Sequence, residues 1–515
     1  MSLNLALVLR EAAREFPERT ALAVGETKLP YKKVHELAQL FAGGLGGLGV
    51  ARGEHVALML PNVPHFTLAY FGSHYAGNPV VPLNVLLTPD EIAYHLEDSD
   101  AAVLVVWEGF YEQARAAFDR VVGCRHLVVA KADPTDVAAP VGAHNMTALI
   151  GRATPVTDLP DTMPDDTAVI LYTSGTTGRP KGAELTHFNL FYNAEYVCAR
   201  LLPLKGTQPI ALATLPLFHS FGQTVMHNAM LMSGGTIVLL PRFEVAAACT
   251  AIQDHKVTVF AGVPTMYFAL LHDPQVATYD LSSLRYCMSG GAAMPVEVMN
   301  AFDERYNVNI LEGYGLSETS PVASFNHLDR PKKVGSIGTP IWGVEFQLRD
   351  DDGAQIHEPG TPGEIWIKGH NIMKGYYKRP EATAKAIQDG WFATGDIATC
   401  DADGFYAIVD RKKDMIIRGG FNVYPRELEE VLYAHEAIAE AAVIGVPDDK
   451  LGEEVKAVVA LKPGATCRVE ELRAYCKEHL AAYKYPRVYE IIDALPKGPT
   501  GKILKRELRE PEAAK

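Results

Sequence analysis

The chain has 515 residues, more than one hydrophobic core usually serves, so we expect one large domain with a smaller one or about three compact units. Its 62 acidic and 48 basic residues give a net charge of −14, which excludes a general attraction to nucleic acid or to an anionic membrane. Hydrophobic residues make up 48% of the chain and charged residues 21%, proportions typical of a soluble globular protein.

The N-terminus and the cysteines indicate the compartment. Charged side chains follow Met1 closely, so no signal peptide is expected, and no apolar run is long enough to span a bilayer. The cysteines lack the CxxC or CxxH spacing of a zinc site or a disulfide framework. We therefore expect a cytoplasmic protein with no transmembrane segment. The cysteines are Cys124, Cys198, Cys249, Cys287, Cys400, Cys467 and Cys476.

The N-terminal part alternates helical and strand patterns. Residues 34–48 and 66–73 carry apolar side chains at helical spacing, whereas residues 56–60, 80–81 and 103–106 are short apolar runs typical of buried strands. This alternation predicts an α/β fold with parallel strands.

Two further segments have local signatures. Residues 88–91, Thr-Pro-Asp-Glu, predict a helix start, with Thr88 as N-cap and Glu91 placed to close a capping box. Residues 133–164 are rich in Pro, Asp, Thr and Ala, and predict a connection.

A polar loop follows the apolar run at residues 168–171, which predicts a strand. Residues 172–182 read YTSGTTGRPKG, a mixture of hydroxyls, glycines and one lysine suited to surrounding a polyphosphate with backbone N–H groups, Oγ donors and an ammonium. A P-loop is rejected, because Gly175 and Gly178 are too close together and Gly182 stands where Ser or Thr is needed.

The string of residues 172–182 resembles the phosphate-binding loop of the adenylate-forming superfamily, which includes acyl-CoA synthetases, luciferases and peptide-synthetase adenylation domains. The match covers eleven consecutive positions. The resemblance implies that the loop binds ATP and AMP and that Thr173 also joins catalysis and the metal. The implied nucleotide-binding residues of this loop are Thr173, Ser174, Gly175, Thr176, Thr177, Gly178 and Lys181.

Residues 186–196 predict a helix, and residues 215–222, LPLFHSFG, follow it. A lone histidine in an apolar stretch is usually a core residue. Acyl-CoA synthetases carry a similar Pro-x-Phe-His segment, which implies that His219 helps to shape the acyl site and joins catalysis. The residues implied to bind the acyl group are His219, Phe221, Val225, Gly315, Pro321 and Val322.

Two glycine-containing blocks come next. Residues 289–293, SGGAA, offer small side chains where a flat base could lie against backbone. Residues 313–319, GYGLSET, resemble the family's Tyr-Gly-x-x-Glu block, in which the Tyr packs on adenine, the Thr contacts phosphate and the Glu binds Mg²⁺. A carboxylate suits a magnesium held mainly through ATP, so Glu318 is the expected metal ligand and a catalytic residue. The implied nucleotide contacts are Gly291, Ala292, Gly313, Tyr314, Gly315 and Thr319.

The blocks at residues 391–396 and 410–421 resemble the family's ribose-binding and hinge segments. Asp396 is implied to accept hydrogen bonds from the ribose hydroxyls, as an ionised carboxylate can, and Arg411 to meet the same ribose. Lys413 occupies the hinge position. The residues implied to line the CoA tunnel are Gly419, Gly420 and Phe421.

Beyond the hinge, helical and strand patterns predict a small α+β domain of roughly 100 residues. Residues 425–435 and 469–480 predict helices, and residues 439–446 and 456–461 predict strands. Residues 496–502, PKGPTGK, resemble the family's closing motif, in which the last lysine bridges the carboxylate and the α-phosphate. Lys502 is thus implied to be catalytic and to bind ATP.

The resemblance spans essentially the whole chain and is greatest to bacterial fatty-acyl-CoA synthetases. It implies a large N-terminal domain of helix-covered mixed sheets over residues 1–412 and a mobile C-terminal domain over residues 413–515. The implied activity uses ATP, Mg²⁺ and coenzyme A to turn a small-molecule carboxylic acid into acyl-AMP and then into its CoA thioester. Fatty acid metabolism is the expected setting.

The acyl group stays open between alkyl and aryl acids. No Arg or Lys occurs at residues 221–232 or 260–271, so a dicarboxylate lacks a counter-ion. An amino acid is disfavoured, since adenylation domains carry an Asp where this chain has Phe218-His219. Apolar, adaptable side chains favour a medium- to long-chain fatty acid, with a coumarate- or benzoate-type ligase as the alternative.

Two readings outside this activity remain. A fatty-acyl-AMP ligase would stop at the adenylate, but its characteristic inserted segment is not evident here. A non-catalytic nucleotide-binding relative would be expected to lose Lys502 or Glu318, and this chain keeps both. A homodimer also stays open.

Overall fold

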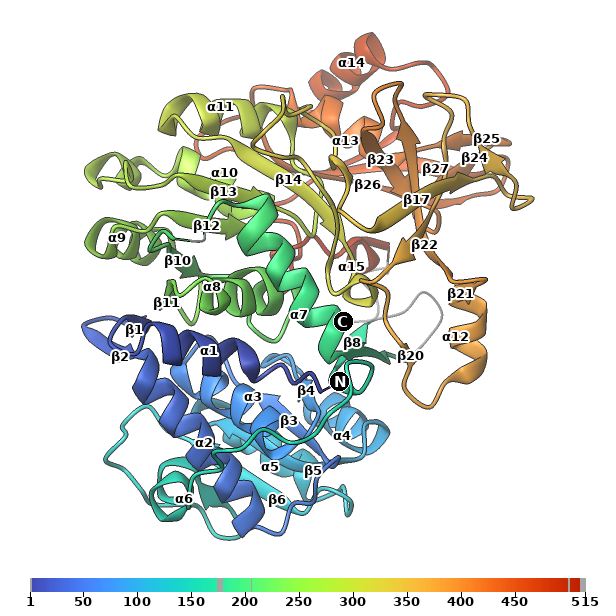
Figure 1. The fold of residues 1–515 in the computed structure, drawn as a ribbon. Helices are drawn as coiled ribbons and strands as arrows, with labels where there is room; N and C mark the ends of the chain where they lie inside the picture. The colour runs from blue at the N-terminus through green and yellow to red at the C-terminus, as the bar shows by residue number, and fades with distance from the viewer. Residues whose placement is uncertain (1, 174–178, 205, 499–500, 510–515) are drawn as a thin grey trace.

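The computed structural model describes residues 2–173, 179–204, 206–498 and 501–509, which fold into a large mixed α/β domain and a small C-terminal domain (Figure 1). This confirms the predicted fold class. Strands of the described residues form three sheets in the large domain and one in the small domain. Among the described helices, none combines the length and apolarity needed to cross a membrane.

The first sheet has the strand order β20-β9-β8-β4-β3-β5-β6-β7. Its central strands are parallel and buried, which explains their uninterrupted Val, Ile and Leu runs. The strands are β3 (His55–Met59), β4 (Val80–Pro82), β5 (Ala101–Trp107), β6 (His126–Ala130), β7 (His144–Asn145), β8 (Thr167–Thr173), β9 (Lys181–Thr186) and β20 (Gly375–Tyr376).

Helices pack beside this sheet, in the blue and cyan part of Figure 1. At the start of α4, Thr88 and Glu91 form the predicted capping box: the Thr88 side chain accepts a hydrogen bond from the Glu91 N–H, and the Glu91 carboxylate accepts one from the Thr88 N–H. The helices of this part are α1 (Leu7–Glu15), α2 (Tyr31–Gly47), α3 (Pro64–Ala76), α4 (Pro89–Asp98), η1 (Glu108–Phe110), α5 (Tyr111–Phe118) and α6 (Met146–Arg152).

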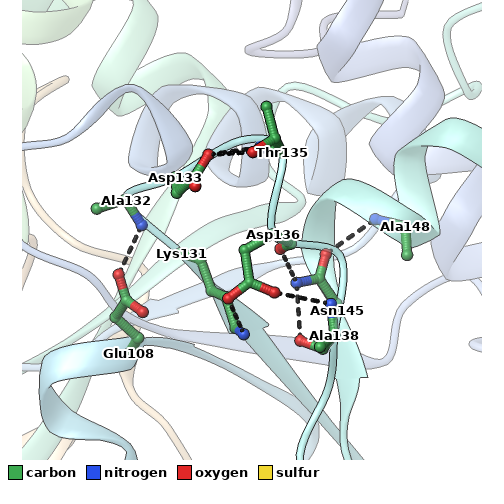
Figure 2. Close-up of polar contacts among 9 residues, drawn as sticks. All are labelled: Glu108, Lys131, Ala132, Asp133, Thr135, Asp136, Ala138, Asn145 and Ala148. Carbon is green, nitrogen blue, oxygen red and sulfur yellow. Dashed lines mark hydrogen bonds and ion pairs between the residues drawn. The ribbon is translucent and has the colours of Figure 1, made fainter.

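Residues 133–164 are more structured than predicted, since they contain β7 and α6 (Figure 2). Lys131 Nζ lies 2.6 Å from the Asp136 carboxylate, and Asn145 Nδ2 donates hydrogen bonds to the carbonyls of Asp136 and Ala138. The Asn145 side chain also accepts from the Ala148 N–H, which caps α6. The prediction of a plain connection was wrong here, because polar caps rather than apolar periodicity define these short elements.

The second sheet has the strand order β16-β15-β14-β13-β12-β10-β11-β1-β2. Strands β11, β10, β12, β13 and β14 are parallel, so their carboxyl ends meet at one edge. The strands are β1 (Thr20–Val24), β2 (Thr27–Pro30), β10 (Ile210–Ala213), β11 (Thr236–Leu239), β12 (Val259–Gly262), β13 (Tyr286–Ser289), β14 (Ile310–Gly315), β15 (Val322–Phe325) and β16 (Thr339–Pro340).

In Figure 1, α7 runs between the first sheet and the yellow-green strands of the second. Thr186 and Asn189 cap the start of α7, which agrees with the helix predicted there. The helices of this part are α7 (His187–Tyr196), the π-helices η2 (Val197–Leu201) and η3 (Gly222–Asn228), α8 (Ala229–Met232), α9 (Val245–His255), α10 (Pro264–His272), η4 (Pro274–Thr278), α11 (Val296–Tyr306) and η5 (Ser317–Thr319).

The third sheet has the order β18-β17-β19-β22-β21, with β23 paired to β22. Pairing of β22 with β23 sets Asp396 directly opposite Arg411. Its elements are β17 (Val344–Arg349), β18 (Gln355–Ile356), β19 (Gly363–Gly369), α12 (Pro380–Ala386), β21 (Ile387–Gln388), β22 (Trp391–Cys400) and β23 (Tyr406–Arg411).

The small domain has its own core around Val443, Val455 and Leu472. Its two longer helices and its long antiparallel hairpin lie where the sequence predicts them. The boundary at residue 412 stays a prediction. The elements are β24 (Ile416–Arg418), β25 (Phe421–Val423), α13 (Pro425–Tyr433), β26 (Ile438–Asp448), β27 (Gly452–Leu461), α14 (Val469–His479), β28 (Val488–Ile491) and α15 (Lys505–Arg509).

Candidate active site

The candidate site lies where the predicted loop leaves the first sheet. Thr173 ends β8 and Lys181 begins β9, and the two residues oppose each other in the antiparallel pair. The predicted contacts from Ser174 to Gly178 lie outside the described residues. The described ends therefore hold a hydroxyl and an ammonium side by side at the neck of the loop.

Glu318 stands beside this neck. Its side chain is buried on η5, and its Oε1 atom accepts hydrogen bonds from Thr173 Oγ1 at 3.1 Å and from the Tyr376 hydroxyl at 3.0 Å. The structure thus brings together Thr173 and Glu318, the two residues expected at the metal. Tyr376 was not predicted, because a tyrosine in a polar stretch gives no signal of its own.

The described residues contain no cluster of three or more His, Cys, Asp or Glu side chains fit to hold a metal ion. A single carboxylate is nevertheless the right donor for a magnesium bound mainly through nucleotide phosphates. Within the part of the chain that the structure describes, the side-chain hydrogen bonds to Glu318 go to Oε1, so its Oε2 atom would suit that ion.

A second group of side chains joins β14 to β22 and β23. The Tyr314 hydroxyl donates to Asp396 Oδ2 at 2.5 Å, and Arg411 Nε lies 3.0 Å from Asp396 Oδ1. The Asp396 charge is the main cause that raises the pKa of Arg411, and burial followed by Asp396 raises the pKa of Tyr314. The three residues expected at adenine and ribose therefore form one connected cluster.

Lys502 reaches this cluster from the small domain. Its side chain keeps access to solvent, yet the protein around its ammonium, together with Arg411, lowers its pKa from 10.5 to about 8. Poor solvation of an ammonium by the protein around it disfavours its charged form. Asp396 and Asp414 oppose the shift.

The turn carrying Lys502 also touches the acyl side of the site. Thr265 Oγ1, at the start of α10, donates a hydrogen bond of 3.3 Å to the Gly501 carbonyl. Burial and the Lys502 charge lower the pKa of His219 to about 4, so this imidazole is neutral at neutral pH. Lys502 and His219 therefore lie within electrostatic reach of each other.

The residues expected at the acyl group come from the segment after His219 and from the region of strands β14 and β15. Phe221, Val225 and Val322 are buried, and the Phe221 N–H donates to His219 Nδ1. Gly315 permits close contact, because a Cβ there would lie 1.7 Å from the Pro321 carbonyl. Of these residues, Val225 lies on the π-helix η3, a conformation that apolar periodicity did not reveal.

Two asparagines of α7 form hydrogen bonds with the backbone of neighbouring segments, including that of Val322, which is expected at the acyl group. Asn193 of α7 donates to the Val322 carbonyl and accepts from the Val322 N–H. Asn189, one turn earlier, donates to the carbonyls of His370 and Ile372. One helix thus binds both β15 and the segment that leads to Tyr376.

The predicted base-binding loop is shaped by glycine and by a residue that the sequence analysis missed. Gly291 has φ +78°, and a Cβ at Gly313 would lie 2.2 Å from the Phe325 ring. Glu312, just before Gly313, is buried and accepts from the Met294 N–H, and its burial raises its pKa to about 7. Its Oε2 atom has no hydrogen-bond partner among the described residues.

Ala292 and Thr319 are two further residues that the sequence analysis expects to contact the nucleotide. Ala292 follows the Gly291 turn and is half-buried. Thr319 is fully buried, and its hydroxyl donates to the Pro321 carbonyl and accepts from the Leu316 N–H. The predicted nucleotide contacts of both residues stay predictions.

The residues expected at the CoA tunnel lie on the β24–β25 turn. Gly419 and Gly420 have φ of +59° and +85°, and the exposed Phe421 ring lies 5.0 Å from that of Tyr483. In Figure 1 this turn is at the outer side of the small domain, away from α15. Lys413, the expected hinge, stands between β23 and β24.

Residues 9–377 match the family of AMP-binding enzymes, and residues 427–502 match the AMP-binding enzyme C-terminal domain. The chain is 39% identical to the long-chain-fatty-acid CoA ligase of Bacillus subtilis (strain 168), over 99% of this chain and 94% of that one. It is also 39% identical to the feruloyl-CoA synthase of Amycolatopsis sp., over 96% of each chain. The fold superposes on the anthranilate CoA ligase AuaEII in complex with anthranoyl-AMP with a TM-score of 0.92, at 30% identity, covering 99% of this chain and 97% of that one.

Proposed function

This chain belongs to the family of AMP-binding enzymes, and on that premise we propose that it is an ATP-dependent, AMP-forming acid–thiol ligase that makes acyl-CoA. A carboxylic acid is first activated by ATP as acyl-AMP, with release of pyrophosphate. The thiol of coenzyme A then attacks the acyl carbonyl and AMP leaves. The observation that carries the proposal is that the turn bearing Lys502 is hydrogen-bonded to Thr265 and lies close enough to the Asp396–Arg411 pair for their charges to act on Lys502.

The adenylation step needs charge stabilisation rather than a protein nucleophile. The substrate carboxylate attacks the α-phosphorus, and negative charge builds up on the phosphate oxygens. Lys502 would stabilise that charge together with Lys181 and the phosphate-binding loop of residues 172–182. Mg²⁺, held by Glu318 and Thr173, would neutralise phosphate charge.

His219 has a different part from these cations. Because its pKa is about 4, it offers a neutral imidazole to the carboxylate end of the substrate. The N–H of Phe221 donates to its Nδ1, so the proton of the neutral ring is on Nε2. His219 would thus orient the carboxylate as a hydrogen-bond donor without forming an ion pair with it.

The thioester step would use a second arrangement of the small domain. We place the hinge at Lys413, after a large domain of residues 1–412, and expect rotation to withdraw Lys502 and bring Gly419, Gly420 and Phe421 towards the acyl-AMP. The position of that turn at the outer side of the small domain supports the need for such a movement (Figure 1).

A medium- to long-chain fatty acid is the acyl group we favour. The buried Val225, Met226 and Val322 supply an apolar, adaptable wall, and each CH₂ buried there would contribute about 0.8 kcal/mol. The similarity to a long-chain-fatty-acid CoA ligase supports this choice. An aryl acid is the second candidate, supported by equal identity to a feruloyl-CoA synthase.

The test is AMP release with ATP, Mg²⁺ and a panel of acids from acetate to palmitate, plus coumarate, ferulate and benzoate, with and without CoA. CoA-dependent turnover that peaks at one alkyl length would support the fatty-acyl assignment, and a peak on an aryl acid would replace it. Adenylate that accumulates regardless of CoA would instead indicate an acyl-AMP ligase. Absence of adenylation with every acid would overturn the proposal.

A further inference from the structure

We infer that Tyr376 is a positioning residue that orients Glu318 with its hydroxyl and steers Lys181 with its ring. The inference rests on the proposed function, because it concerns the two residues expected to meet the metal and the phosphates of ATP. Tyr376 touches neither reacting atom. Its effect would pass through those two side chains.

The strand pairing places Tyr376 beside the neck of the phosphate loop. In the pair of β20 with β9, Tyr376 lies opposite Ala183. Side chains two residues apart on a strand share a face, so the Tyr376 ring is on the Lys181 face of β9. Thr173, opposite Lys181 in the pair of β8 with β9, adds its side chain to the same face.

The backbone of Tyr376 is fixed from a second side. Its N–H donates a hydrogen bond of 2.8 Å to Thr383 Oγ1 on α12. Gly375 has φ +156°, and a Cβ there would lie 2.9 Å from Thr383 Cγ2, so this contact depends on the glycine. The short strand β20 is therefore held between β9 and α12.

The hydroxyl of Tyr376 acts on one oxygen of Glu318. It donates to Oε1 at 3.0 Å, and Thr173 Oγ1 donates to the same atom at 3.1 Å. A tyrosine hydroxyl carries its proton at neutral pH, so it is the donor in this contact and the carboxylate oxygen is the acceptor. Among the described residues these two donors both meet Oε1, which turns the carboxylate so that Oε2 would be available to the cation.

The ring of Tyr376 acts on Lys181. The ammonium lies 5.0 Å from the ring centroid, and within the described residues Lys181 forms no ion pair with a carboxylate. A cation–π contact of this kind attracts the ammonium to the ring face, so it can orient a flexible side chain without neutralising it. The ring therefore holds the Lys181 side chain near the place where the phosphates of ATP are expected.

Tyr377 provides a matched control one residue along the chain. Its hydroxyl also donates to a carboxylate, that of Asp100 at 2.8 Å, away from Glu318. Tyr377→Phe and Tyr376→Phe remove the same atom and the same kind of hydrogen bond. Only the second change reaches the residues expected at the metal.

The experiment is pyrophosphate release with the full chain and its best acid, first titrated with Mg²⁺ at fixed ATP and then with ATP at saturating Mg²⁺. For Tyr376→Phe we expect the half-saturating Mg²⁺ concentration to rise about tenfold, since a hydrogen bond to a charged group is lost, while KM for ATP changes less than twofold. Tyr376→Leu also removes the ring, so KM for ATP should rise several-fold as well. Tyr377→Phe should match the wild type in both titrations.

Equal Mg²⁺ dependence of Tyr376→Phe and Tyr377→Phe would overturn the inference. So would a fall in the melting temperature of Tyr376→Phe with an unchanged Mg²⁺ requirement, because that is the result of a purely structural role. Glu318→Gln separates this failure from that of the proposed function. If Glu318→Gln abolishes adenylation, only the role of Tyr376 is wrong; if it adenylates normally, the role of Glu318 fails first.

Discussion

Asp396 and Arg411 face each other across β22 and β23, with Arg411 Nε 3.0 Å from Asp396 Oδ1. The same carboxylate accepts a hydrogen bond from the Tyr314 hydroxyl through its other oxygen. Side chains from β23 and β14 therefore hold the buried carboxylate of Asp396 on β22 in place. We expect the ribose of ATP to bind at this carboxylate.

Asp396→Asn should weaken ATP binding more than it changes the acid specificity. The amide would leave Arg411 without its carboxylate and would offer the ribose a weaker acceptor, so KM for ATP should rise about 10- to 100-fold. Asp403→Asn, on the exposed ion pair with Lys333, is the control and should have no effect. Unchanged ATP affinity of Asp396→Asn in calorimetry would contradict the ribose assignment.

Lys502→Ala should separate the two half-reactions. Loss of the ammonium at the developing phosphate charge should slow adenylation by about 100- to 1,000-fold, whereas thioester formation from supplied acyl-AMP should stay within a few-fold of the wild type. The control is Lys505→Ala. It removes another nearby ammonium, the one that pairs with Glu429. Equal losses in both steps would show that the lysine has no separate role in adenylation.

The pH dependence of adenylation should report Lys502. Its pKa is lowered to about 8, so the ammonium is present below that pH and is lost as the pH rises through it. kcat/KM for ATP should therefore fall above about pH 8, because this ratio reports ionisations of the free enzyme. Lys502→Arg, which stays charged, should be slower but should lack this descending limb. A limb that persists in the arginine variant belongs to another group.

Glu312 should make the folded protein less stable as the pH rises. Its folded pKa of about 7 lies above the ordinary value of 4.5, so its protonated form is favoured in the fold, and stability is lost between about pH 4.5 and 7. Glu312→Gln should remove this dependence and gain at most about 3 kcal/mol above pH 7. Denaturant titrations at pH 5 and pH 8 test it, with exposed Glu297→Gln as control. A gain that is equal at both pH values would rule out titration as its cause.

The sequence predicts well what local patterns determine. Buried strands such as β5 and β8 are runs of Val, Ile and Leu, and the capping box at Thr88 and the helix start at Thr186 are readable from a few adjacent residues. The candidate site residues Thr173, Glu318 and Asp396 stand in strings long enough to be recognised. The structure adds that Thr173 donates a hydrogen bond to Glu318 and that Asp396 accepts one from Tyr314.

Other features depend on contacts between distant segments. Tyr376 acquires its partners only because β20 pairs with β9, and Glu312 acquires its raised pKa only because the surrounding fold buries it. The π-helix η3 has the same apolar composition as an α-helix, so its sequence does not distinguish them. These are properties of packing, and a single sequence does not show them.

Substrate range and nucleotide kinetics should prove hard to alter separately in this protein. Asn193 holds both backbone groups of Val322, and Asn189 on the same helix holds the carbonyls of His370 and Ile372, shortly before Tyr376. A bulkier or smaller residue at position 322 would shift the strand on which α7 rests. Protein engineers who substitute Val322 should therefore measure the Mg²⁺ requirement of every variant along with its preferred acid.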